Sequence, residues 1–242
     1  MDSELFVKIL KKNGPFDGSI IKDIASVSGG CIHQAWKLRF KDGKEIFAKT
    51  GPAEVLPQFL NEAAGLDALK HRINPNLIEV PRPLLIRELS GSALLLMPWL
   101  ELVDKRQQLL GQGLANLHKN SADNNPGQFG WDKDGYIGSG KQPGGWRNNW
   151  GECFVKLRLI PQIKLAAKWG LNICEFELIL DQLILFLNAH NPKPSLVHGD
   201  LWSGNAYSLH AGKGVLIDPA VWWADREVDL AMTQLFGGFP KE

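Results

Sequence analysis

One loop restricts the fold of this chain more than any other feature of the sequence. The loop is HGDLWSGN, residues 198–205, and it leaves the short apolar run at residues 196–197. A second apolar run, residues 215–217, ends in another carboxylate, Asp218. The chain thus runs from a strand into an Asp-x-x-x-x-Asn loop, and then through a second strand to another Asp. This order predicts a site where a carboxylate accepts a proton and where carboxylate and amide oxygens bind a metal ion.

The spacing from Asp200 to Asn205, with Asp218 at the end of the next strand, is that of the catalytic loop and metal-binding Asp of kinases. In that arrangement Asp200 takes the proton of the attacking hydroxyl group, and Asn205 and Asp218 bind Mg²⁺ at the phosphates of ATP. The plain alternative is an Asp/Asn turn that caps a helix. We reject it because His198 precedes Asp200 and because Asp218 follows on a strand.

Residues nearer the N-terminus supply candidates for phosphate binding. Gly29 and Gly30 lie between two predicted strands, where backbone N–H groups can approach phosphate oxygens. Lys49, in the run FAK, lies on the following strand, the position of the lysine that holds the α- and β-phosphates. Glu62 lies on the apolar stripe of a predicted helix at residues 57–71, where a carboxylate needs a partner. We therefore expect an ion pair between Lys49 and Glu62.

The order of predicted elements indicates an α+β fold with two lobes. Residues 1–97 are expected to form a small antiparallel β-rich lobe with one helix, and residues 98–242 a larger, mostly helical lobe. Pro98, Trp99 and Leu100 join the lobes, where an adenine base can dock on backbone groups between apolar walls. Helices of the second lobe are predicted at residues 105–119, 149–169 (bent or broken near Pro161) and 174–189. Residues 121–147, rich in Gly, Asn, Asp and Pro, predict a long functional loop between the first two helices.

Composition and charge exclude several classes of partner. Lys plus Arg total 27 and Asp plus Glu 26, so the net charge of +1 supplies no bulk field for nucleic acid or an anionic membrane. The longest apolar stretch, residues 178–187, is interrupted by polar residues and too short to span a bilayer. Acidic residues near Met1, with no apolar core after them, predict no secretory signal and a cytoplasmic protein.

Three cysteines are too few for a disulfide framework. Cys153 and Cys174 fall in predicted helices, and we expect both in the core. Cys31 follows Gly29 and Gly30 in the loop expected to cover the phosphates, and two interpretations stay open. It is either a small residue tolerated in a tight turn, or a thiol whose oxidation switches activity and can link two chains.

The sequence resembles the fructosamine kinase (ketosamine-3-kinase) family over nearly its whole length. The resemblance rests on HGDLWSGN, on IDPAVWWADREVDLAMTQLFGGFP at residues 217–240, and on the upstream runs SGGCIHQAWKL, FAKTG and FGWDKDGYIG. It implies the two-lobed protein-kinase-like fold of aminoglycoside and choline kinases. It also implies ATP- and Mg²⁺-dependent phosphorylation of the 3-hydroxyl of ketosamines, free or attached to proteins, as a step of deglycation repair.

The resemblance assigns roles to the residues already singled out. Asp200 resembles the catalytic base, Asn205 and Asp218 the metal ligands, Lys49 and Glu62 the phosphate-positioning pair, and residues 98–100 the adenine hinge. His198 and Asp229 are expected to anchor the catalytic loop without contacting the substrates. Trp202 is either a platform for the apolar face of a sugar or a core residue.

Where the sequence departs from the family pattern, other functions stay open. Family members continue past FGGFP, whereas only Lys241 and Glu242 follow that run here, so we expect the terminal helices of the family to be lacking. One alternative is a kinase for another small hydroxyl compound, such as an aminoglycoside or an amino alcohol. The other is a catalytically impaired nucleotide-binding module. The preferred sugar, the amine and the oligomeric state are not determined by these residues.

Overall fold

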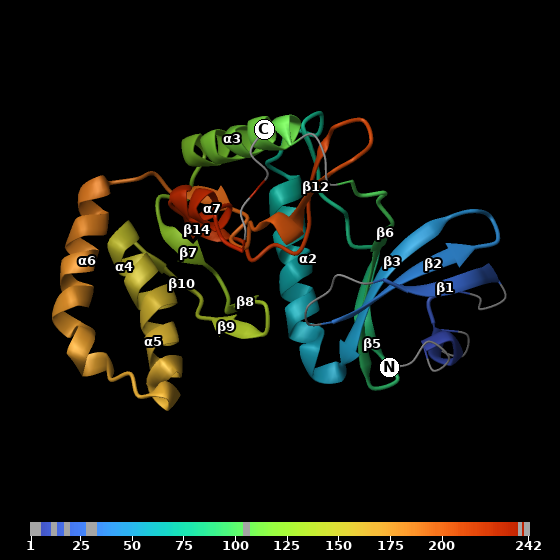
Figure 1. Ribbon diagram of the computed structural model, residues 1–242, viewed down its shortest axis with the longest axis horizontal. Coiled ribbons are helices and arrows are strands. Elements are labelled where there is room, and N and C mark those ends of the chain that lie inside the picture. Colours follow the sequence, from blue (N-terminus) through green and yellow to red (C-terminus); the bar gives the residue numbers. More distant parts are fainter. Residues whose placement is uncertain are drawn as a thin grey trace.

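The computed structural model describes residues 6–10, 14–16, 20–27, 33–103, 107–236 and 239, which form two lobes (Figure 1). The N-terminal lobe is a β-sheet with the helix α2 against it, and the C-terminal lobe is mostly helical, with short strands at its centre. The predicted glycine loop, Gly29 and Gly30, lies outside the described residues, and so does Cys31. No helix of the described residues is long and apolar enough to cross a membrane.

The N-terminal lobe is built on a five-stranded antiparallel sheet in the order β1-β2-β3-β6-β5. Its middle strand β3 pairs with β2 on one side and with β6 on the other, and Lys49 lies opposite Leu95 in that register. A strand flanked on both sides is held firmly, so a side chain that it carries is fixed in place. The strands are β1 Ile21–Val27, β2 Gln34–Phe40, β3 Glu45–Pro52, β5 Leu85–Leu89 and β6 Ser92–Pro98.

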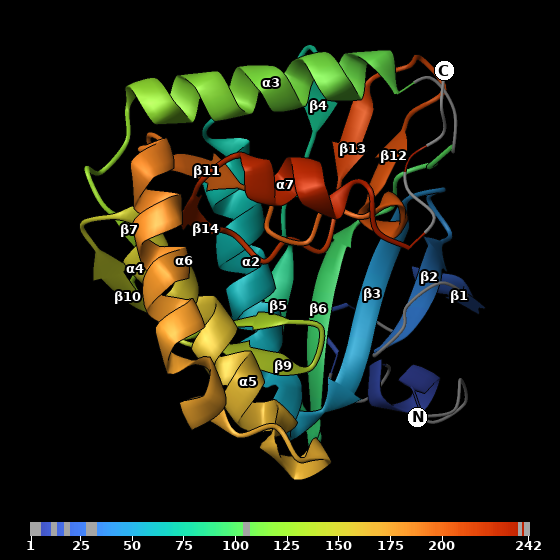
Figure 2. The same ribbon diagram turned by 60° about the vertical axis from the view of Figure 1, so that its left-hand side comes forward.

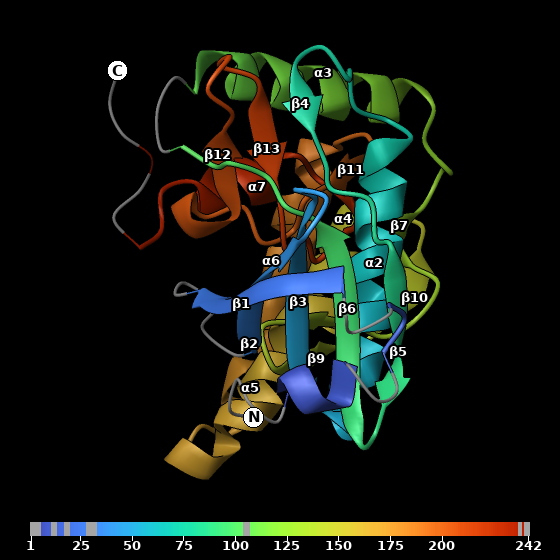
Figure 3. The ribbon, with the colours of Figure 1, turned by 90° about the vertical axis from the view of Figure 1, so that its right-hand side faces the viewer.

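Side chains alternate between the two faces of this sheet, as strand geometry requires. On β6, Leu95 and Met97 pack with Phe59 of α2, whereas Leu94 and Leu96 pack in a separate cluster on the opposite face. The helical segment at residues 6–10 covers that opposite face, as Figure 3 shows. The face covered by α2, Leu56–Lys70, is the one that turns toward the C-terminal lobe.

The two lobes are connected by the chain after β6 and by a strand pairing. β4, Ile78–Glu79, belongs to the N-terminal part of the chain but pairs in parallel with β13, Gly214–Leu216, which itself pairs with β12, Ala206–Ser208. The crossover leads into α3, Gln108–Asp123, three residues later than the predicted start of that helix. One continuous apolar cluster runs from α2 through β6 to α3 and β13.

A second sheet, in the order β10-β7-β14-β11, supports the centre of the C-terminal lobe. The region after α3, predicted as a long loop, in fact contributes four short strands to the lobe. Two of them join this sheet and two form a separate hairpin, β8 and β9. The strands are β7 Phe129–Trp131, β8 Gly135–Ile137, β9 Gly140–Gln142, β10 Gly145–Arg147, β11 Ser195–Val197 and β14 Trp222–Ala224.

The outer edge of the C-terminal lobe is made by α4, α5 and α6 (Figures 1 and 2). The break predicted near Pro161 is confirmed, because the chain leaves α-helical geometry just before it, in a π-helical turn at Val155–Leu159. Pro161 lies in the first turn of α5, where its missing N–H costs nothing. The prediction that Cys174 is a core residue is wrong, since its side chain is exposed, whereas Cys153 is buried. The helices are α4 Trp150–Phe154, α5 Ile160–Ala166 and α6 Glu177–His190.

Candidate active site

A cavity of about 900 Å³ lies between the two lobes and collects the residues predicted to carry the chemistry. Lys49 comes from β3 and Glu62 from α2, and the C-terminal lobe contributes the rest. The lining thus combines residues that are far apart in the sequence. Of the predicted site residues, those that line it are Lys49, Glu62, Pro98, Trp99, Leu100, Asp200, Trp202, Asn205 and Asp218.

The loop between β11 and β12 is held by His198, whose side chain is fully buried. The ring Nε2 donates to the carbonyl oxygen of Ile217 at 2.9 Å, and the ring Nδ1 accepts from the backbone N–H of Asp200 at 3.3 Å. Only the neutral ring can do both, because a protonated ring has no acceptor. Burial lowers the pKa of His198, in agreement with this pattern, although the carboxylate of Asp229 opposes the shift. His198 thus ties the loop to the segment that carries Asp218.

Asp229 holds the same loop from the side of α7, Glu227–Met232. Its carboxylate accepts the backbone N–H groups of His198 at 2.8 Å and Gly199 at 2.9 Å. His118 of α3 donates from Nε2 to the same carboxylate at 2.8 Å. The side chain of Asp229 is fully buried, so all three donors are paired away from water. The catalytic loop is therefore anchored to two helices.

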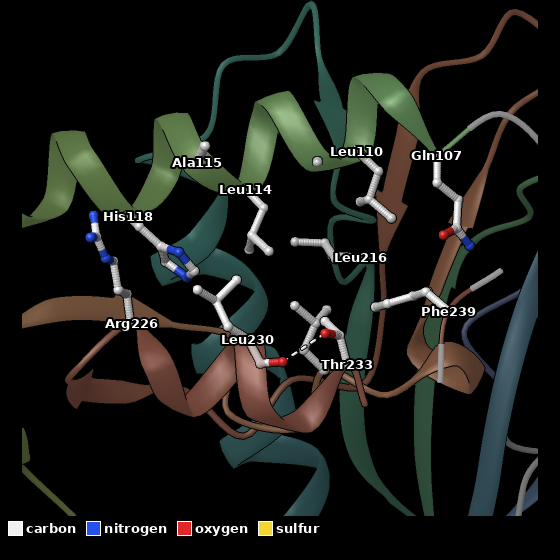
Figure 4. Close-up of a pocket in the computed structure, with 12 residues that line it drawn as sticks. Gln107, Leu110, Leu114, Ala115, His118, Leu216, Arg226, Leu230, Thr233 and Phe239 are labelled. Carbon is white, nitrogen blue, oxygen red and sulfur yellow. Dashed lines mark hydrogen bonds between the residues drawn. The ribbon is translucent and has the colours of Figure 1, made fainter. Parts of the chain in front are cut away.

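Figure 4 shows His118 pointing from α3 toward α7, at one end of a second cavity of about 370 Å³. Leu114, Leu216 and Leu230 make its walls largely apolar. His118 and Arg226 line it, but His118 is already bonded to Asp229, and Lys49, Asp200, Asn205 and Asp218 all line the other cavity. We therefore assign the chemistry to the larger cavity between the lobes.

Gly199 is required by the backbone of the loop. Its φ is +82°, a region that residues with a side chain rarely adopt. A Cβ atom there would also lie 2.1 Å from the carbonyl oxygen of Ala220. Protein kinases carry an arginine directly before the catalytic aspartate. In this chain the backbone at residue 199 leaves no room for a side chain, which explains why glycine stands there instead.

Asp200 and Asn205 are linked directly across the loop. The side-chain Nδ2 of Asn205 donates to the backbone oxygen of Asp200 at 2.9 Å and to its carboxylate Oδ2 at 3.0 Å. This orientation turns the amide oxygen of Asn205 away from Asp200. Burial raises the pKa of Asp200, whereas the nearby imidazole of His198 and the amide of Asn205 lower it. The balance leaves a carboxylate that is a somewhat stronger base than an exposed aspartate.

The ion pair expected between Lys49 and Glu62 is present in the structure. Lys49 Nζ donates to both carboxylate oxygens of Glu62, at 2.8 and 3.0 Å, and also to the carboxylate of Asp218. Burial of Lys49 opposes its charge, but the two carboxylates outweigh burial and raise the pKa of Lys49. Burial raises the pKa of Glu62 to about 7, although Lys49 acts in the opposite direction. One ammonium charge is thus shared between two carboxylates.

Asp218 has backbone geometry that is uncommon for a residue with a side chain. Its φ is +53°, in the left-handed region. Such conformations store strain and occur often at functional sites. The conformation turns the Asp218 side chain toward Lys49, in the cavity that Asn205 also lines.

The oxygens of Asn205 and Asp218 suit a magnesium ion. Mg²⁺ prefers oxygen ligands and is typically held by one or two carboxylates together with the phosphates of a substrate. Asn205 and Asp218 line the same cavity, and both offer side-chain oxygens. No cluster of three or more His, Cys, Asp or Glu side chains that could hold a metal ion alone is found among the described residues. The donor set therefore fits an ion that arrives with phosphate oxygens.

The predicted hinge, residues 98–100, lines the same cavity as Asp200. The indole Nε1 of Trp99 donates to Glu101 at 2.6 Å, and the Lys37 ammonium lies 4.2 Å from the centre of the indole ring. The backbone N–H of Trp99 bonds to the carbonyl oxygen of Glu45 at 3.4 Å. These contacts fix Trp99, and its neighbours Pro98 and Leu100 line the cavity beside it.

Trp202 is half-buried and lines the cavity, so its interpretation as a core residue is wrong. Its ring packs over Gly204, where a Cβ atom would approach it to 2.2 Å. The ring also makes an edge contact with Phe236, with 5.8 Å between the ring centres. Together the two rings form an aromatic wall close to Asp200.

Three contributors to this site escaped prediction from the sequence. His118 bonds to Asp229 from a helix that lies far away in the sequence. His33 and Tyr136 also line the cavity. His33 and Tyr136 fall in the runs SGGCIHQAWKL and FGWDKDGYIG that carry the family resemblance, which was the available signal for these two, whereas nothing next to His118 marks it. The positions of Gly29, Gly30 and Cys31 relative to the cavity lie outside the described residues.

Comparison with known proteins decides the family. The sequence model described as "Fructosamine kinase" matches residues 8–242. The chain belongs to the fructosamine kinase family. A relative from Synechocystis sp., named as a probable ketoamine kinase, is 39% identical over 224 residues, which cover 91% of this chain and 73% of the relative. A second, from Klebsiella aerogenes and named in the same way, is 37% identical over 222 residues, covering 90% of this chain and 75% of the relative.

A solved structure from Haemophilus somnus 129PT, assigned there as a fructosamine-3-kinase, superimposes with a TM-score of 0.81 at 28% identity. The match covers 98% of this chain and 78% of that one. The predicted α+β, protein-kinase-like fold of this fructosamine kinase family member is therefore confirmed. Membership of the family also makes the chain a phosphotransferase.

Proposed function

We propose that this fructosamine kinase family member transfers the γ-phosphate of ATP to the 3-hydroxyl group of a ketosamine, in a reaction that needs Mg²⁺. One observation carries the proposal: a base, two oxygen ligands and a paired lysine face the same cavity, beside an aromatic wall. The relatives named as probable ketoamine kinases support ketosamines as the class of substrate. The proposed role is deglycation of amines, either small molecules or proteins, in the cytoplasm.

In the proposed reaction the ketosamine lies against Trp202 and its hydroxyl group donates a hydrogen bond to the carboxylate of Asp200. The hydroxyl oxygen forms a bond to the γ-phosphorus, the bond from that phosphorus to the bridging β–γ oxygen breaks, and ADP leaves. The proton of the hydroxyl group passes to Asp200. The raised pKa of Asp200, caused by burial, favours this acceptance.

The other residues position the donor. Lys49 holds the α- and β-phosphates, and Glu62 keeps its ammonium group in place. Asn205 and Asp218 hold Mg²⁺, which when bound neutralises charge on the phosphate oxygens. The adenine base docks beside residues 98–100. His198 and Asp229 keep the backbone at Asp200 fixed, because their hydrogen bonds tie the loop to α7 and to the Asp218 segment.

The proposal is tested by measuring ADP release with a panel of acceptors. Fructose and ribulose adducts of Nα-acetyl-lysine represent ketosamines, and kanamycin and choline represent other hydroxyl compounds. We expect ADP release with the ketosamines only, together with a product heavier by one phosphate and no reaction in EDTA. Equal rates with kanamycin or choline would favour the broader small-molecule kinase. ATP binding without turnover on any acceptor would favour an impaired nucleotide-binding module.

A further inference from the structure

The β8–β9 hairpin connects the two lobes beside the candidate active site. It is a two-stranded sheet of its own, in which Tyr136 pairs with Lys141. Its base is held in the C-terminal lobe, where the carboxylate of Asp134 accepts the backbone N–H of Gly144 at 2.9 Å. Its strands nevertheless lie against α2 of the other lobe, as Figures 1 and 2 both show.

The contact with α2 is made by Asn61. The side-chain Oδ1 of Asn61 accepts the backbone N–H of Tyr136 at 3.3 Å. The amide group of Asn61 also lies close to Gly135: a Cβ atom added at Gly135 would be 3.6 Å from it, which is ordinary van der Waals contact. A side chain of the N-terminal lobe thus takes the place of a strand partner for the edge of the hairpin.

The position of this contact along the cavity is informative. Asn61 directly precedes Glu62, which pairs with Lys49. The contact is therefore made by the residue next to the one that holds Lys49, the proposed phosphate-binding group. Tyr136 and Ile137 of the hairpin line the same cavity as Asp200 and Trp202, where the acceptor of the proposed reaction must lie.

We propose that the β8–β9 hairpin is one wall of the acceptor subsite and that Asn61 is its positioning residue. The inference rests on the proposed function, because it takes the acceptor to be a ketosamine. In this arrangement Tyr136 faces the acceptor opposite the Trp202 wall and contributes to acceptor specificity. Asn61 itself lines the cavity, and its proposed role is to fix the hairpin through the backbone of Tyr136.

A coupling between the two substrates follows from the placement of Asn61 and Glu62 on one helix. Phosphates that bind Lys49 fix Glu62 and with it α2, and α2 fixes the hairpin through Asn61. Nucleotide binding should therefore strengthen acceptor binding, and by thermodynamic linkage the acceptor should strengthen nucleotide binding by the same factor. Loss of the Asn61 contact should remove this mutual effect while leaving the binding of each substrate alone nearly unchanged.

The experiment uses Asn61→Leu, which keeps the size of the side chain but removes its hydrogen-bond acceptor. Asn61→Asp keeps the acceptor and tests rescue. Asn120→Leu is the matched control, because Asn120 is an exposed helical asparagine that does not line the cavity. The Kd of a non-hydrolysable ATP analogue is measured with and without the fructose adduct of Nα-acetyl-lysine. Steady-state KM and kcat for that adduct and the melting temperature are measured for each protein.

We expect Asn61→Leu to raise KM for the ketosamine by about 2- to 12-fold, the range that one hydrogen bond supports, and to leave the Kd of the nucleotide alone, without the adduct, unchanged. The ratio of the Kd of the ATP analogue without the adduct to its Kd with the adduct should fall toward one in Asn61→Leu. It should return to the wild-type value in Asn61→Asp. Tyr136→Phe should change the ratio of kcat/KM between fructose and ribulose adducts. Asn120→Leu should match the wild type in every measurement.

Two results would overturn the inference while the proposed function stands. One is a wild-type enzyme that phosphorylates the ketosamine together with an Asn61→Leu variant of unchanged KM and unchanged coupling. The other is a drop in melting temperature alone, which indicates a purely structural contact. A wild-type enzyme that phosphorylates no ketosamine rejects the proposed function itself, so the two failures are separable.

Discussion

Replacement of Asp229 by Asn tests how the catalytic loop is held. Asp229 is completely buried and accepts three hydrogen bonds, from His198 N, Gly199 N and His118 Nε2. Asn has the same shape, but it offers an NH₂ group in place of one oxygen. Oδ2 of Asp229 accepts two of these bonds and Oδ1 only the one from Gly199, so the NH₂ group costs least in the place of Oδ1. There it faces the N–H of Gly199, and two donors without an acceptor between them repel each other.

The cost follows from the contacts that change. The lost bond to Gly199 is worth about 1.5–3 kcal/mol, because its acceptor is charged. The bonds from His198 and His118 remain, but an uncharged acceptor makes each of them roughly half as strong. The sum is a loss of about 3–6 kcal/mol in the free energy of unfolding. For a chain of this length that corresponds to a fall in melting temperature of about 6–24 °C.

Activity should fall as well, although Asp200 itself is unchanged. The backbone N–H of Gly199 directly precedes Asp200, so a shift of this loop moves the base relative to the acceptor hydroxyl. A displacement near 1 Å costs about 100-fold in rate, and we expect kcat for the ketosamine to fall by about 10- to 100-fold. Urea unfolding and calorimetry measure stability, and the ADP-release assay measures kcat.

The matched control is Asp225→Asn. Asp225 is also buried, but it pairs with His190, which is 58% exposed, and caps the backbone of Glu227. Among the described residues its carboxylate bonds to these two partners and not to the catalytic loop, so we expect a loss of about 1 kcal/mol and a normal kcat. Wild-type stability and kcat in Asp229→Asn, or equal damage in both variants, would refute the argument that Asp229 anchors the loop.

Three further outcomes are expected. Lys49→Met and Glu62→Gln should each lower kcat/KM by at least about 10-fold. A double-mutant cycle should show losses that are less than additive, because the two side chains act as a pair. Additive losses would give Glu62 another role. Gly199→Ala should lower the melting temperature and kcat together, because its Cβ collides with a backbone oxygen, and a fully active variant would contradict the loop geometry. A thiol reagent at pH 8 should label the exposed Cys174 in the native protein but not Cys153. Burial raises the pKa of Cys153 to about 12, so this side chain stays a neutral thiol. Rapid labelling of Cys153 would contradict its burial.

The sequence predicts those parts of the site that depend on local spacing. Asp200, Asn205 and Asp218 lie on one loop and the strand after it, so their meeting follows from the chain itself. The pairing of Lys49 with Glu62 was predicted across two elements because an unpaired carboxylate on an apolar stripe is costly.

Features that depend on packing between distant segments were not predicted. The bond between His118 and Asp229 needs α3 and α7 to lie side by side, and nothing local to either residue indicates it. The β8–β9 hairpin is too short and too rich in glycine to give a strand signal, so the region was read as a loop. Cys174 was placed in the core because it falls in a predicted helix, yet its side chain is exposed.

The central claim is that Asp200 is the base for phosphate transfer to a ketosamine. A single-turnover experiment mixes enzyme in excess with γ-³²P-labelled ATP, Mg²⁺ and the fructose adduct of Nα-acetyl-lysine, and follows label on the sugar. The wild type should transfer label to the sugar, whereas Asp200→Asn should do so about 10²- to 10⁴-fold more slowly with an unchanged Kd for ATP. Transfer by Asp200→Asn at the wild-type rate, or no label on the sugar with the wild type, would contradict the claim.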